Sequence, residues 1–168
     1  MKMFQKGDYV VYGVKGVCEV LDVTCLNVPG IPKDKQYYVL RPNSQKDSKV
    51  FIPVDGEKKT VLRPILTKEE ANKLVDMIPD VEELWVANEK QREEQYKEAI
   101  RSCECREWVK IIKTLYLRKQ KRLAEGRKTT AMDEKYFRLA EANLHEELAV
   151  SLGIPKNEME HYIEAHIR

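Results

Sequence analysis

The chain has 168 residues, of which 42% are hydrophobic and 35% are charged, and its formal net charge at pH 7 is +2. This length suits one medium domain or two small ones, and the hydrophobic content excludes a wholly disordered chain. The basic residues are unevenly distributed, because residues 106–128 contain nine basic and two acidic residues and lie between two acidic segments. Such a segment is typical of proteins that bind a phosphate backbone or an acidic partner.

Residues 1–65 contain short alternating runs and turn residues, which are typical of a small β domain. Strands are predicted at residues 9–12, 17–23, 36–40, 49–53 and 60–65. Residues 13–16 form a predicted turn, and residues 42–48 form a predicted polar hairpin loop. Five short strands without an intervening helix predict an SH3-like or Tudor-like barrel, because closing a small sheet protects its edges.

From residue 66 onward the sequence has helical periodicity, and residues 66–168 are predicted to form an all-α domain of about five helices. These helices are expected at residues 67–79, 80–102, 106–124 and 130–152, and from Pro155 onward. Thr67 and Glu70 form the capping-box pattern of a helix start. The sequence therefore predicts an α+β protein with two domains, residues 1–65 and residues 66–168.

The third predicted helix has a basic side. At about 100° per residue its basic face contains Arg106, Lys110, Lys113 and Lys121, with Arg118 and Arg122 at the flank. Trp108 lies among apolar residues on the other side and is assigned to the core. An ordinary solvated face, which is the alternative interpretation, mixes charges to form i,i+4 pairs, whereas this face has almost no acidic residues. We therefore interpret the six basic residues as a DNA-binding surface that meets successive phosphates.

Trp85 lies near the expected start of the second helix. Packing in the core is the usual fate of a tryptophan on a helix. The alternative is an exposed ring that wedges into a DNA minor groove. Because Leu84 can anchor the helix inward while Trp85 points about 100° away from it, the pattern leaves both alternatives open.

The four cysteines are Cys18, Cys25, Cys103 and Cys105. A four-thiolate zinc site would require two pairs from different predicted domains, so no metal is expected. A cysteine-based redox activity is an alternative that would need a lowered thiol pKa at Cys103 or Cys105. The sequence has no Gly-rich phosphate loop and no Ser/His/Asp constellation, so neither catalysis nor a cofactor is expected.

Several segments, taken in order, resemble the CarD/CdnL family of bacterial transcription regulators. They are residues 3–12, Gly16, residues 35–40, 50–54, 92–96, 108–117 and 140–153. The N-terminal segments also resemble the polymerase-interacting module of transcription-repair coupling factors. The resemblance implies a barrel that binds the β subunit of RNA polymerase and a helical domain that contacts the upstream edge of the transcription bubble. It also implies a tryptophan wedge that stabilises the open promoter complex, which favours that role for Trp85.

Under this resemblance, the polymerase contact is expected at an exposed strand formed by Lys49, Val50, Phe51 and Ile52, because a strand edge can pair with a partner strand. We expect a monomer that binds RNA polymerase and duplex promoter DNA. The sequence shows no secretory signal and no apolar stretch long enough to span a bilayer, so the protein is expected in the cytoplasm, associated with the nucleoid through RNA polymerase. The alternative is a polymerase-associated interaction module whose helical domain binds another protein instead of DNA.

Overall fold

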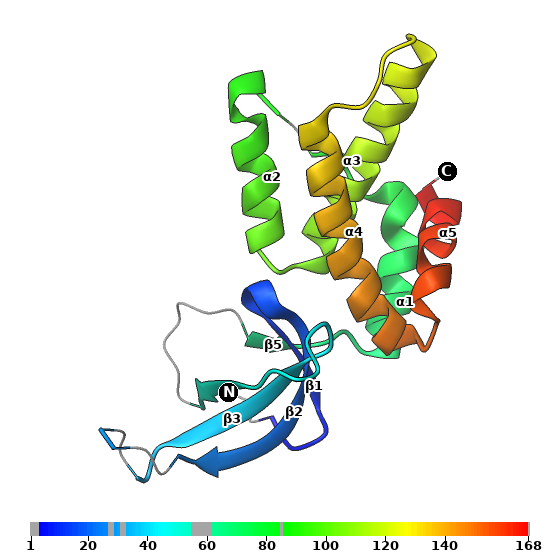
Figure 1. The fold of residues 1–168 in the computed structure, drawn as a ribbon. Helices are drawn as coiled ribbons and strands as arrows, with labels where there is room; N and C mark the ends of the chain where they lie inside the picture. Colours follow the sequence, from blue (N-terminus) through cyan, green and yellow to red (C-terminus); the bar gives the residue numbers. More distant parts are fainter. Residues whose placement is uncertain (1–3, 27–28, 31–32, 55–61, 85, 168) are drawn as a thin grey trace. The chain divides into compact units, whose positions relative to one another are not determined.

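The structure is a computed structural model that describes residues 4–26, 29–30, 33–54, 62–84 and 86–167. The chain divides into two compact units, Met1–Ile65 and Leu66–Arg168, which we call the β unit and the helical unit (Figure 1). The predicted α+β fold, a sheet followed by about five helices, is confirmed. No helix among the described residues is long and apolar enough to cross a membrane.

The β unit contains one antiparallel sheet with the strand order β4-β3-β2-β1-β5. Its strands are β1 (Tyr9–Tyr12), β2 (Gly16–Cys25), β3 (Gln36–Pro42), β4 (Val50–Pro53) and β5 (Leu62–Pro64). A short 3-10 helix, η1 (Gly13–Lys15), forms the predicted turn between β1 and β2. The register shifts between Val20 and Asp22, a β-bulge position that bends β2 as it pairs with β3. All five predicted strands are therefore present.

The core of the β unit consists of inward-facing side chains at alternate strand positions. Its buried members are Val10, Cys18, Val20, Tyr38, Leu40 and Ile52. The alternation follows the two-residue period of a strand, which places every second side chain on the same face. Phe4 closes against this core, because its ring packs edge-on against Tyr38 at a centroid distance of 5.6 Å and its backbone N–H donates to the Tyr38 hydroxyl.

The helical unit is built around one long helix. Its helices are α1 (Lys68–Met77), α2 (Arg92–Arg101), α3 (Cys105–Ala124), α4 (Ala131–Leu152) and α5 (Lys156–Ile167), with the 3-10 helices η2 (Ile78–Asp80) and η3 (Glu89–Gln91). All four other α-helices pack against α4, and the turn between α3 and α4 lies at one end of the unit (Figure 1). The predicted capping box of Thr67 and Glu70 is present, and Trp108 is 2% exposed, as its assignment to the core requires.

The second helix begins at Arg92 and not at Asp80, so the predicted helix over residues 80–102 is wrong in its first half. After η2, Val81 has extended backbone angles (φ −70°, ψ 130°), and the described residues from 81 to 88 have no regular secondary structure. Two backbone groups of this segment bind side chains of α3 in place of helical partners: the Leu84 N–H donates to Thr114, and the Val81 carbonyl oxygen accepts from Lys113. Because those side chains lie far away in the sequence, local periodicity could not show this arrangement.

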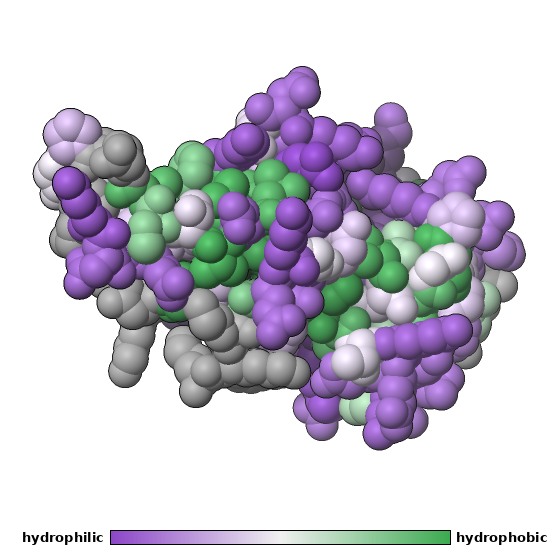
Figure 2. Space-filling view, turned by 90° about the horizontal axis from the view of Figure 1, so that it is seen from below, coloured by the Kyte–Doolittle hydropathy of each residue, from purple (hydrophilic) through white to green (hydrophobic). Residues whose placement is uncertain are grey.

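Charged side chains occupy much of the surface, and Figure 2 shows them around several apolar areas on one face. The large apolar side chains that are exposed include Phe51 on β4 and Leu117 and Leu123 on α3. Phe51 is 47% exposed, so β4 presents an apolar ring to solvent.

Candidate functional site

The fold removes Lys113 from the basic face that the sequence predicted. Lys113 is 9% exposed, and its Nζ donates to the carbonyl oxygens of Ile78, Pro79 and Val81 at 3.0, 2.8 and 2.7 Å. The prediction that Lys113 lies in solvent is therefore wrong. Its ammonium group instead binds carbonyls at the end of α1 and η2, where a helix leaves acceptors unsatisfied and favours a positive charge.

The other five basic residues that were predicted to contact DNA remain at least partly accessible. Arg106 and Lys121 are exposed, Lys110 is half-buried beside Glu107, and Arg122 is half-buried with its Nε donating to the Lys128 carbonyl oxygen. Basic side chains gather at the C-terminal end of α3 and in the turn that follows: Arg118, Lys119, Lys121, Arg122, Arg127 and Lys128. We call these six residues the basic end of α3.

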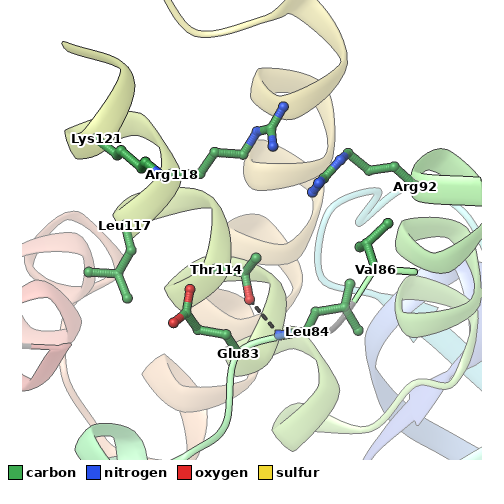
Figure 3. Close-up of a pocket in the computed structure, with 8 residues that line it drawn as sticks. All are labelled: Glu83, Leu84, Val86, Arg92, Thr114, Leu117, Arg118 and Lys121. Atoms are coloured by element: carbon green, nitrogen blue, oxygen red, sulfur yellow. Dashed lines mark hydrogen bonds between the residues drawn. The ribbon is translucent and has the colours of Figure 1, made fainter. Parts of the chain in front are cut away.

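A cavity of about 310 Å³ lies next to the basic end of α3 (Figure 3). It is lined by Glu83, Leu84, Val86, Arg92, Thr114, Leu117, Arg118 and Lys121. Three cationic side chains and three apolar ones therefore face the same hollow. Trp85 lies outside the described residues, but both of its chain neighbours line this cavity. The lining also includes one carboxylate, that of Glu83.

Arg92 organises one side of the cavity. Its guanidinium donates to both carboxylate oxygens of Glu89 at 2.8 and 2.6 Å and to the Tyr96 hydroxyl at 3.1 Å. The hydrogen bond from Arg92 lowers the pKa of Glu89 and raises the pKa of Arg92, which keeps this pair ionised. A bidentate pair of this kind fixes η3 against the start of α2.

Arg118 connects the cavity to α4. Its Nε donates to Asp133 at 2.6 Å, and the Tyr96 hydroxyl donates to the other oxygen of Asp133 at 3.2 Å. Burial raises the pKa of Tyr96, so its hydroxyl remains a donor. Figure 3 shows Arg118 and Arg92 extending toward each other from α3 and α2. Arg118 was predicted from its position on the helix, whereas Arg92 and Asp133 were not singled out.

Only part of the hydrogen-bond network around Arg92 and Arg118 could be predicted from the sequence. Glu89 precedes Arg92 by three residues and Tyr96 follows it by four, spacings at which helical side chains meet. Asp133 is recognisable only as part of an N-cap pattern with Thr130, whose hydroxyl accepts from the Asp133 backbone N–H. Its contact with Arg118 needs the pairing of α3 with α4, which the sequence does not show.

The predicted polymerase-binding strand is divided between core and solvent. Lys49 and Phe51 are exposed and Val50 is half-buried, but Ile52 is 9% exposed and belongs to the core of the β unit. The Val54 backbone N–H donates to the Gln36 carbonyl oxygen. Because donors alternate along an antiparallel strand, the N–H groups of Val50 and Ile52 also face β3, whereas that of Phe51 points to the other side.

Among the described residues, no group of three or more His, Cys, Asp and Glu side chains is placed to hold a metal ion. Cys103 and Cys105 are buried, and the Cys105 thiol lies 3.1 Å from a carboxylate oxygen of Glu147. The other oxygen of Glu147 accepts from the Leu66 backbone N–H. This buried carboxylate therefore connects the start of the helical unit to α3 and α4.

Two family models match the chain. The CarD-like/TRCF RID domain matches residues 4–66, and the CarD C-terminal domain matches residues 73–164, which is more than half of the chain. No curated protein sequence matches it. The two matches follow the division into the β unit and the helical unit, and their family is non-catalytic. The chain therefore belongs to the CarD-like family of transcription regulators, which interact with RNA polymerase.

Proposed function

We propose that this protein binds the β subunit of RNA polymerase through its β unit and duplex promoter DNA through its helical unit, and that it thereby stabilises the open promoter complex. The DNA contact is supported above all by the basic end of α3, where Lys119 and Lys121 are exposed and Lys121 lines the cavity together with Leu84 and Val86. Cations on one helix end can contact successive phosphates without reading the base sequence.

Within this proposal, Trp85 is the residue that inserts into the minor groove. Its neighbours Leu84 and Val86 line the same cavity as Arg118 and Lys121, so residues that would hold phosphates lie close to the chain that carries the ring. An inserted aromatic ring unstacks a base step, and contacts with the distorted DNA offset that cost. A ring held in this way would slow the closing of the transcription bubble.

The double variant Lys119→Gln/Lys121→Gln tests the phosphate contacts. Its affinity for duplex DNA should fall for all sequences alike, and the negative slope of log K against log salt should become shallower by about 0.9 for each phosphate contact that is lost. The affinity is measured by fluorescence anisotropy over a series of salt concentrations.

Lys73→Gln provides the matched control. Lys73 is an exposed lysine on α1 that pairs with Glu69, and its replacement should leave the slope unchanged. If the folded double variant keeps the slope of the unmodified protein, α3 does not face DNA, and the helical unit is better described as a protein-interaction module attached to polymerase.

A further inference from the structure

Two consecutive residues of α3 hold the chain that leads to position 85. Lys113 binds the carbonyl oxygens of Ile78, Pro79 and Val81. Thr114 accepts a hydrogen bond of 2.7 Å from the Leu84 backbone N–H through its hydroxyl oxygen, as Figure 3 shows. Both side chains are buried, since Thr114 is 7% exposed, so water competes little for these bonds.

The chain after position 85 is held as well. Asn88 accepts from the Lys90 backbone N–H and begins η3, and Glu89 is bound by Arg92 on both carboxylate oxygens. The guanidinium of Arg118, one helical turn after Thr114 on α3, lies 4.0 Å from Glu89. The irregular segment is therefore fastened to the helical unit on both sides of position 85.

We propose that Thr114 and Lys113 are positioning residues for the DNA contact, acting through Trp85 without touching DNA themselves. This inference rests on the proposed function, in which Trp85 enters the minor groove. A segment that is ordered before binding loses less conformational entropy when DNA arrives, and therefore binds more tightly. The hydrogen bond of Thr114 ends at Leu84, so it fixes the backbone directly before position 85.

The variant Thr114→Val removes the hydroxyl and keeps the shape of the side chain. It should shorten the lifetime of the open promoter complex several-fold, measured with the full-length protein, RNA polymerase and a promoter fragment. Thr114→Ser, which keeps the hydroxyl, should restore most of that lifetime. The decisive measurement is the double variant Thr114→Val/Trp85→Ala. If Thr114 acts through Trp85, the double variant should be no worse than Trp85→Ala alone, because the two effects belong to one contact.

Ile111→Val is the control for general destabilisation, because Ile111 is fully buried on α3 and does not line the cavity. Its open-complex lifetime should remain normal. A normal lifetime for a folded Thr114→Val variant, beside a shortened one for Trp85→Ala, would overturn the positioning role and leave the proposed function standing. The positioning role would also be overturned if adding Thr114→Val to Trp85→Ala shortened the open-complex lifetime by the same factor as Thr114→Val alone. A normal lifetime for Trp85→Ala would overturn both proposals.

Discussion

Lys113 shows how one residue can have the sequence signature of a DNA contact and the structure of a helix cap. Its three carbonyl partners lie 32 to 35 residues earlier in the chain. A buried ammonium group that makes three hydrogen bonds is compensated for its lost hydration, whereas the same group facing an apolar surface would not be. The hydrogen bonds of Lys113 should therefore contribute directly to the free energy of unfolding, whereas any effect of Lys113 on DNA binding is indirect.

Replacing Lys113 with methionine tests this at the scale of a single residue. The variant keeps the apolar stem but leaves the carbonyls of Ile78, Pro79 and Val81 without the ammonium donor. The free energy of unfolding should fall by about 1–3 kcal/mol, the usual cost of leaving a buried acceptor without its hydrogen bond. The measurement is equilibrium denaturation in urea, with exposed Lys121→Met as the control, which should change stability by less than about 0.5 kcal/mol. Equal stability of the two variants would contradict the capping role.

At the scale of the element, β4 combines two functions in alternate positions. Ile52 points into the core of the β unit, whereas Phe51 has an exposed ring and a backbone N–H that points to the edge away from β3. In the part of the sheet that the structure describes, β3 is the neighbour of β4 and β4 stands at the end of the strand order. An exposed strand with an outward donor can accept a strand of the polymerase, and the exposed ring adds an apolar contact.

Phe51→Ala should weaken binding to RNA polymerase several-fold while the β unit stays folded, because Phe51 is already 47% exposed. Phe51→Pro should weaken it further, since proline also removes the outward N–H and is tolerated at a strand edge. The affinity of the full-length protein for immobilised core RNA polymerase is measured by surface plasmon resonance. Ile52→Ala serves as the comparison, because it should lower the stability of the β unit by about 2–5 kcal/mol. Unchanged affinity in both Phe51 variants would exclude β4 as the polymerase contact.

At the scale of the whole molecule, the chain consists of two compact units. His145 on α4 gives the helical unit a pH response. It is buried, and burial followed by the charge of Lys156 lowers its pKa from 6.5 to about 4. The folded unit therefore keeps His145 neutral at a pH at which the unfolded chain protonates it.

The sign of this effect follows from proton linkage. Below pH 6.5 the unfolded state takes up a proton that the folded state binds only near pH 4, so stability should fall as the pH is lowered through this range. The slope from this group is at most about 1.4 kcal/mol per pH unit. The pH dependence of stability is measured from the unfolding midpoint of the helical unit at successive pH values. His145→Gln, which cannot titrate, should flatten that part of the profile, and an identical profile in the variant would exclude His145 as the cause.

Much of the fold could be predicted because it depends on close neighbours in the sequence. The strands follow from alternating β-branched runs, and the start of α1 follows from Thr67 and Glu70. The burial of Trp108 follows from the apolar side of α3. The cluster of basic residues between 106 and 128 is likewise a property of the sequence alone. Periods of two and 3.6 residues carry this information within a few positions.

Tertiary structure decided which of those residues are available for binding. It buried Lys113, placed Ile52 in a core and began α2 at Arg92, since the segment before α2 binds α3 through the Val81 carbonyl and the Leu84 N–H. The hydrogen bond between Thr114 and Leu84 spans 30 residues, and that between Arg118 and Asp133 requires α3 and α4 to lie side by side. A lysine on a helix face has the same periodicity whether it meets a phosphate or a carbonyl oxygen. Its role is therefore determined by the segment that folds against it.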